Sequence, residues 1–169
     1  IEAKTKTYLK NDKQVVAAGK RYAKGDTSAL DESERIAQKY GIEKRTVQAA
    51  IRSVAGIKTY SDSLTDGTDN IYADMHTAIA AKDNEAAAEI AGELIKAKIA
   101  ENIAKGKSAD KAKNDVYYGV RSSIASNWKE AYLKASSTER AEIRESLYAT
   151  GAYSSLYALD KTLANWRNG

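Results

Sequence analysis

The chain has 169 residues, 43% of them hydrophobic, which is enough for the core of one domain or of two small helical units. It contains no cysteine and no proline, so disulfides and thiolate metal sites are excluded and nothing interrupts helices. The net charge of +4 is segregated: residues 1–60 carry +6, residues 61–94 carry −7 and residues 95–169 carry +5.

Hydrophobic residues recur with helical spacing along nearly the whole chain, and the sustained alternation that is typical of strands is missing. Val47, Ile51 and Val54, for example, step by four and three onto one helix face. We therefore predict an all-α fold, a multi-helix array of about eight helices arranged as helix-turn-helix pairs. The predicted helices span residues 2–24, 28–40, 43–59, 69–81, 84–105, 109–134, 138–149 and 153–167.

Polar capping residues and glycines mark the expected helix ends. Ser136 and Glu139 have the spacing of a capping box, in which each side chain accepts from the backbone of the other residue. Glycine after a helix adopts the positive φ that ends it without steric penalty. The other candidate N-caps are Ser28 with Asp31, Asp83 and Ser108, and the candidate C-terminal glycines are Gly41, Gly106 and Gly151.

The only long candidate linker is the polar, acidic segment 61–70. We therefore predict an N-terminal helical unit at residues 1–60, an acidic linker at 61–70 and a C-terminal helical unit at 71–169. Tyr22–Gly41 and Tyr132–Gly151 have similar patterns, which indicate either an internal repeat or only the shared requirements of a helix hairpin. The chain begins with Ile1 in sequence typical of a helix interior, so we expect a fragment of a longer protein.

Residues with catalytic or metal-binding chemistry are sparse. The acidic segment fails as an EF-hand loop, because Leu64 and Ala73 stand at two positions that need oxygen ligands. His76 is the sole histidine, which excludes His-rich zinc sites, and no short nucleotide-binding or hydrolase motif is present. We expect that the protein is not an enzyme, and we predict no catalytic, cofactor-binding or metal-binding residue. No run approaches the ~18 apolar residues of a membrane span.

The sharpest functional pattern is Glu34–Arg52, which resembles the helix-turn-helix of bacterial DNA-binding proteins. Ala37 allows two helices to approach and Gly41 permits the turn between them. If the second helix reads DNA, Arg45 and Gln48 suit base edges, whereas Lys44 and Arg52 suit phosphates. Any tight helix hairpin needs the same alanine, glycine and apolar positions, so packing alone is the competing interpretation.

Aromatic and basic residues alternate between Tyr117 and Lys134. Rings spaced in this way could stack on single-stranded bases, but on one long helix they more often close a core. We favour the core. The residues expected to hold the C-terminal unit together are Trp128, Ile143, Leu147, Leu159, Leu163 and Trp166.

The segment 108–168, with Trp128-Lys129, Glu139-Arg140 and a closing Asn165-Trp166, resembles helical segments of large bacteriophage virion and ejected proteins. The resemblance covers about a third of the chain and carries no catalytic residue. It implies a location in the virion or in the cytoplasm of a bacterial host. Our first functional hypothesis is therefore a non-catalytic structural or interaction module that binds protein partners or self-assembles. The alternative is a DNA-binding helix-turn-helix domain.

Overall fold

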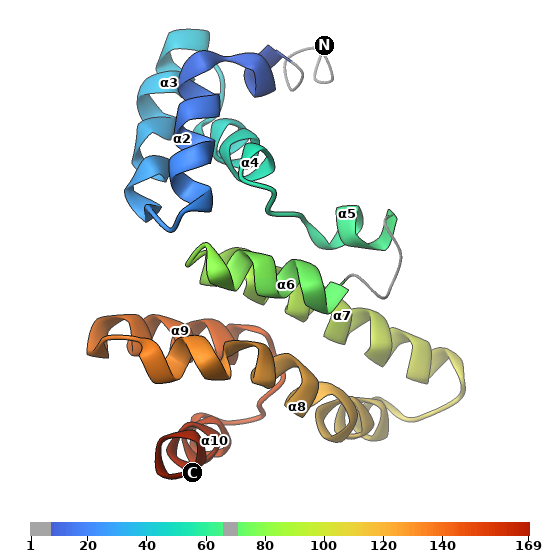
Figure 1. The fold of residues 1–169 in the computed structure, drawn as a ribbon. Helices are drawn as coiled ribbons and strands as arrows, with labels where there is room; N and C mark the ends of the chain where they lie inside the picture. The colour runs from blue at the N-terminus through green and yellow to red at the C-terminus, as the bar shows by residue number, and fades with distance from the viewer. Residues whose placement is uncertain (1–7, 66–70) are drawn as a thin grey trace. The chain divides into compact units, whose positions relative to one another are not determined.

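The computed structural model describes residues 8–65 and 71–169 (Figure 1). Within these ranges the chain forms helices and no strand, which confirms the predicted all-α multi-helix fold. In chain order the helices are α2 (Lys13–Ala23), the 3₁₀ helix η1 (Thr27–Glu32), α3 (Ser33–Tyr40), α4 (Lys44–Val54), α5 (Tyr60–Thr65), α6 (Ile71–Ala80), α7 (Asn84–Ala104), α8 (Ala109–Lys134), α9 (Ser137–Ala149) and α10 (Leu156–Asn168).

Contacts divide the chain into two compact units. Of the described residues, the first unit contains 8–58 and 80–83, and the second contains 59–65, 71–79 and 84–169. This division differs from the predicted one in two places, because 59–65 belongs to the second unit and 80–83 to the first. Within the predicted linker 61–70, the first residues continue helix α5, and residues 66–70 lie outside the described ranges.

The first unit corrects three predicted helix boundaries. The predicted helix 2–24 is interrupted at Asp12, whose carboxylate accepts from the amides of Gln14 and Val15 and so begins α2. The predicted helix 28–40 starts as the 3₁₀ helix η1, capped by Asp26 instead of Ser28. The predicted helix 43–59 ends at Val54, because Gly56 takes a positive φ of 84°.

Helices α2 and α4 approach each other closely at Gly19, a buried residue in the interior of α2. A Cβ added to Gly19 would lie 2.4 Å from the Val54 side chain and 3.1 Å from the carbonyl oxygen of Ile51. The missing side chain therefore lets the two helices pack together. A glycine in a helix interior usually destabilises the helix, but here its lack of a side chain is required for packing.

We expect Gly19→Ala to destabilise the first unit by about 1–3 kcal/mol, since the extra methyl forces Val54 or the helix to move. Urea denaturation measures the change in the free energy of unfolding. Gly119→Ala is the matched control, because a Cβ on this exposed position of α8 meets no atom within 4 Å. It should stabilise by about 0.5–1 kcal/mol through helix propensity. Equal effects from both variants would contradict the close approach at Gly19.

The second unit is built around α7, α8 and α9, with α10 packed on α8 and α9. Alanines fill much of the buried face of α7, and larger residues of α8, α9 and α10 close the core. Five of the six predicted core residues are buried and Trp166 is half-buried, as is expected for a ring at a helix end. The five buried ones are Trp128, Ile143, Leu147, Leu159 and Leu163.

Helix ends in the second unit agree closely with the predictions. Ser136 caps α9 by accepting from the Glu139 amide at 3.2 Å, and its hydroxyl lies 3.0 Å from the Glu139 carboxylate. Ser108 caps α8 in the same way, through the amide of Lys111. The predicted helix 153–167 begins later than expected, at Leu156, because Ser155 is its N-cap.

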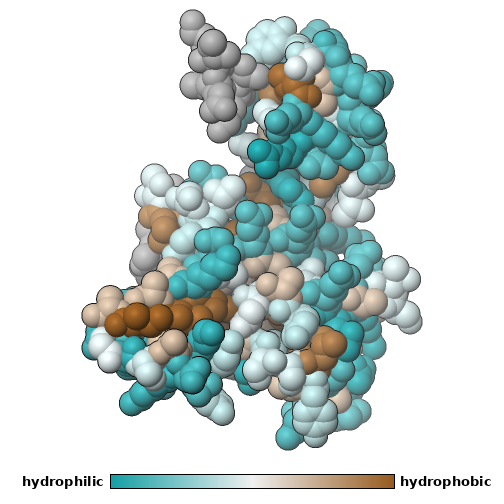
Figure 2. Space-filling view, turned by 180° about the vertical axis from the view of Figure 1, so that it is seen from behind, coloured by the Kyte–Doolittle hydropathy of each residue, from teal (hydrophilic) through white to brown (hydrophobic). Residues whose placement is uncertain are grey.

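The surface is mostly hydrophilic on the face seen in Figure 2, with hydrophobic side chains exposed in isolated patches. The exposed large apolar side chains of the second unit include Leu64, Ile103, Leu133 and Leu156. Among residues 8–65 and 71–169, no helix combines the length and the apolar character needed to cross a membrane.

Candidate nucleic-acid interface

A tight turn joins α3 to α4. Gly41 adopts the left-handed conformation (φ 64°, ψ 37°), and the Ile42 amide donates to the carbonyl of Ala37 at 3.1 Å. Glu43 then returns to extended geometry and α4 begins at Lys44. Glycine is favoured here because it adopts this φ without the penalty that a residue with a side chain would carry. The turn that the sequence predicted at Gly41 is confirmed.

Helices α3 and α4 pack against each other through buried apolar side chains. Ile36 of α3 and both Val47 and Ile51 of α4 are 0% exposed, and Ala37 is 5% exposed. Helix α2 covers the same core, where it packs against α4. Helices α2 and α3 therefore fix the orientation of α4, and one face of α4 is buried in the core of the unit.

The N-terminal half of α4 also carries polar residues that are accessible to solvent. Lys44 and Arg45 in its first turn are exposed, and Gln48 one turn later is half-buried. The Arg45 side chain is 86% exposed and lies 3.1 Å from the Glu43 carboxylate, a contact too exposed to hold it firmly. These three predicted residues thus form a polar row at the N-terminal half of α4, with donors available to a ligand.

Arg52, the fourth predicted residue, has a different environment. Its guanidinium binds Asp83 of the segment Ala80–Asp83, with Nε 2.7 Å from Oδ2 and Nη2 3.4 Å from Oδ1. Asp83 is buried and is also hydrogen-bonded to Tyr22. Burial would lower the pKa of Arg52, but the attraction of Asp83 outweighs it and raises that pKa. Burial, followed by the hydrogen bond to Asp83, raises the pKa of Tyr22.

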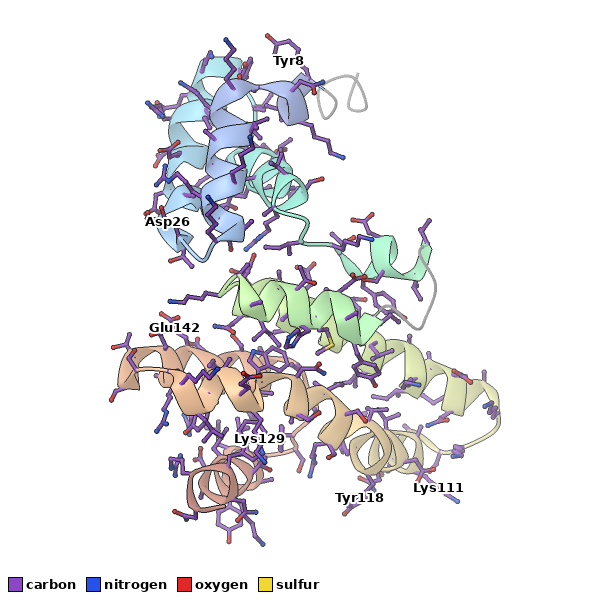
Figure 3. All side chains as sticks on the ribbon, viewed as in Figure 1. Tyr8, Asp26, Lys111, Tyr118, Lys129 and Glu142 are labelled. Atoms are coloured by element: carbon purple, nitrogen blue, oxygen red, sulfur yellow. The ribbon has the colours of Figure 1, made fainter. Side chains whose placement is uncertain are left out.

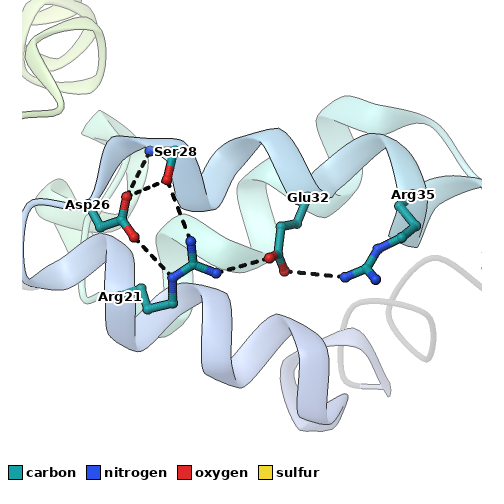
Figure 4. A network of polar contacts seen from close by, with 5 residues as sticks. All are labelled: Arg21, Asp26, Ser28, Glu32 and Arg35. Carbon is teal, nitrogen blue, oxygen red and sulfur yellow. Dashed lines mark hydrogen bonds and ion pairs between the residues drawn. The ribbon is translucent and has the colours of Figure 1, made fainter.

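A second ion-pair network joins the end of α2 to the start of α3 (Figure 4). Arg21 contacts Asp26 at 3.0 Å and Glu32 at 2.9 Å, and Arg35 lies 3.5 Å from Glu32. The hydrogen bonds from Ser28 and Arg21 hold the pKa of Asp26 below its usual value. All these groups are partly exposed, so solvent screens each pair and the network contributes little to stability.

The end of the first unit that contains the start of α2 and the end of α3 is basic. A shallow hollow of about 580 Å³ lies there, and Lys13 and Lys39 are on its wall. The one carboxylate in the hollow, Asp12, is occupied by the Tyr40 hydroxyl and two backbone amides. Burial alone raises the pKa of Asp12, but these hydrogen bonds outweigh it and lower the pKa. Lys39 also lies near this carboxylate, with its Nζ 3.8 Å from Asp12 Oδ2, a long contact that leaves 55% of the lysine side chain exposed.

The aromatic residues of α8 do not share one face. Trp128 and Tyr132 are buried, whereas Tyr118 is 85% exposed and points away from the helix (Figure 3). Trp128 donates its Nε1–H to Asn84 Oδ1 at 3.0 Å, which is the role of a core residue with one polar partner. The run Tyr117–Lys134 is therefore not a continuous stacking surface.

Within residues 8–65 and 71–169, no three histidine, cysteine, aspartate or glutamate side chains gather in a way that could hold a metal ion. The sole histidine, His76, is exposed on α6. Within the acidic segment tested as an EF-hand loop, residues 66–70 lie outside the described ranges.

The described residues define an all-α protein whose first unit is a three-helix bundle with a tight turn before its outward-facing helix. Comparison with known proteins found no matching family model, no similar curated protein and no similar solved structure. The resemblance of segment 108–168 to phage proteins therefore stays a prediction.

The polar row on α4 could be predicted from the sequence, but two features that shape its surroundings could not. Gly19 carries no motif, and only the approach of α4 explains it. Asp83 directly precedes the first residue of α7, at the position predicted for an N-cap, and its carboxylate also binds Arg52, 31 residues away. A pairing between residues so far apart leaves no periodic signal in one sequence.

Proposed function

We propose that the chain is a binding module whose first unit binds duplex DNA, with α4 in the major groove. The observation that carries the proposal is that α4 is anchored by buried residues while its N-terminal half keeps polar residues accessible. Val47 and Ile51 are fully buried, while Lys44, Arg45 and Gln48 form an accessible polar row. A helix presented in this way, directly after a tight turn, is how helix-turn-helix proteins read DNA.

Each residue of the row suits a part of DNA. The guanidinium of Arg45 can donate two hydrogen bonds to guanine, and the amide of Gln48 can pair with adenine. Lys44 suits a phosphate, as do Lys13 and Lys39 at the same end of the unit. Asp31 and Glu34, both exposed near the start of α3, repel phosphates. We therefore expect modest affinity, with a Kd of about 10⁻⁴ to 10⁻⁶ M for random sequence.

The test is fluorescence anisotropy with a labelled duplex at several salt concentrations. The wild type should bind at low salt, and the slope of log K against log salt should show several phosphate contacts. Lys44→Gln combined with Arg45→Gln should reduce the affinity about 10-fold or more and make the slope shallower by about 1–2.

Lys129→Gln combined with Lys161→Gln is the matched control, because it removes two exposed positive charges from the second unit. The proposal predicts almost no change in affinity for this variant. Absence of binding by the wild type at low salt would overturn the DNA-binding function. Equal losses in the two double variants would instead assign the binding to net charge.

The second unit supports a different role, as an interaction module for neighbouring protein chains. Ile103 is 48% exposed near the end of α7, and the buried face of this helix is rich in alanine. Such a unit gains stability when partners cover its apolar side chains. A place in a phage virion or ejected protein is part of this second proposal.

Sedimentation velocity tests the self-assembling form of this role. A sedimentation coefficient that rises with concentration, and that Ile103→Asp returns to the monomer value, supports it. A monomer at every concentration argues against self-assembly.

A further inference from the structure

The spacing of α4 places Arg52 in line with the proposed DNA-contacting row. Arg45, Gln48 and Arg52 follow one another by three and four residues, so they lie on one face of the helix. From this spacing alone, Arg52 would extend the row of donors into the last turn of α4. The sequence accordingly assigned it to a phosphate.

Asp83 holds this arginine in the way that a phosphate would. The two carboxylate oxygens face two nitrogens of the guanidinium, at 2.7 Å and 3.4 Å. The Asp83 side chain is 2% exposed and that of Arg52 is 23% exposed. A largely buried, charge-assisted pair of this kind is much stronger than the exposed contact between Arg45 and Glu43.

The segment that carries Asp83 is fixed in place. Lys82 has a φ of 64°, and it is the only non-glycine residue in the described ranges with a positive φ. This conformation is unfavourable for a residue with a side chain and persists where surrounding contacts hold it. Tyr22 of α2 holds the neighbouring Asp83, since its hydroxyl is hydrogen-bonded to that carboxylate. The carboxylate is thus held in position beside Arg52.

We propose that Asp83 withholds Arg52 from DNA, so that the first unit contacts DNA through the N-terminal half of α4 alone. This inference rests on the proposed DNA-binding function. Removing the charge of Asp83 frees Arg52 to bind one additional phosphate. The buried carboxylate thereby limits both the affinity and the length of DNA that the unit covers.

The experiment measures binding of a labelled duplex, across a salt series, to the wild type and to Asp83→Asn. The amide keeps the shape of the carboxylate and one of its two acceptor oxygens, and far-UV circular dichroism checks that the fold is retained. Asp83→Asn should bind several-fold more tightly at low salt, with a slope of log K against log salt steeper by about 0.9. Adding Arg52→Gln to this variant should abolish the gain.

Asp31→Asn is the matched control, since it removes an exposed carboxylate of the same unit without touching Arg52. A gain in Asp31→Asn equal to that in Asp83→Asn, or a gain that survives Arg52→Gln, would overturn the inference. So would unchanged binding by Asp83→Asn when the wild type binds normally. Absence of binding by the wild type would overturn the proposed function itself, which keeps the two failures distinct.

A measurement on the wild type makes the test independent of the folding of any variant. The arginine Nε–H resonances of the ¹⁵N-labelled chain report each guanidinium separately. On addition of duplex, the Arg45 signal should shift and the Arg52 signal should stay in place. A shift of Arg52 as large as that of Arg45 would show that Asp83 releases the arginine and would contradict the inference.

Discussion

Trp128→Ala should lower the free energy of unfolding of the second unit by about 3–5 kcal/mol. The Trp128 side chain is 0% exposed, so truncation leaves a large cavity among the helices of this unit. The change also removes the hydrogen bond from its Nε1–H to Asn84, which is 3.0 Å long, and leaves that amide without its partner. Urea denaturation followed by far-UV circular dichroism measures the loss.

Trp166→Ala is the matched control, because the same truncation is made at a half-buried site. Trp166 packs edge-on against Tyr132 with the ring centroids 5.8 Å apart, so its loss should cost much less than that of Trp128. A loss below about 1 kcal/mol for Trp128→Ala, or equal losses for the two variants, would refute the central position of Trp128 in the core.

Asp83→Ala should destabilise the first unit by about 3 kcal/mol. The variant removes the Asp83 charge from beside the largely buried Arg52 guanidinium and removes an acceptor from the Tyr22 hydroxyl. Breaking a buried pair by removing one partner is costly, and the exposure of Arg52, 23%, places the effect at the lower end of the range. The measurement is again the change in the free energy of unfolding in urea.

Asp160→Ala is the control that separates the effect of burial on stability from the effect of ion-pair geometry. Asp160 makes two short contacts with Arg144, at 2.7 Å and 3.0 Å, but the two side chains are 51% and 42% exposed. Solvent screens this pair, so the variant should lose much less stability than Asp83→Ala. Comparable losses at Asp83 and Asp160 would show that burial of Asp83 has no special weight.

Local features of the fold could be predicted from the sequence. Ser136 and Glu139 cap α9 as expected, because a capping box needs only residues three apart. Gly41 adopts the left-handed conformation that ends α3. The burial of Leu147 and Leu163 follows from helical spacing, which places each on the inner face of its helix.

Features that depend on contacts between distant residues could not be predicted. The break at Asp12 was missed because no glycine or proline marks it, although the carboxylate begins a new helix. The accessible half of the candidate site, Lys44, Arg45 and Gln48, was predicted because it lies within one helix. The role of Arg52 depends on Asp83, and the spacing along α4 carries no information about that partner.

The most direct test of the central claim is a map of backbone amide chemical shifts during titration of the ¹⁵N-labelled chain with duplex DNA at low salt. We expect the largest changes to cluster at the turn and the first half of α4, from Gly41 to Ala49, with little change in α8, α9 and α10. A titration without shifts, or one with its largest shifts in the second unit, would contradict the assignment of α4 as the DNA-binding helix.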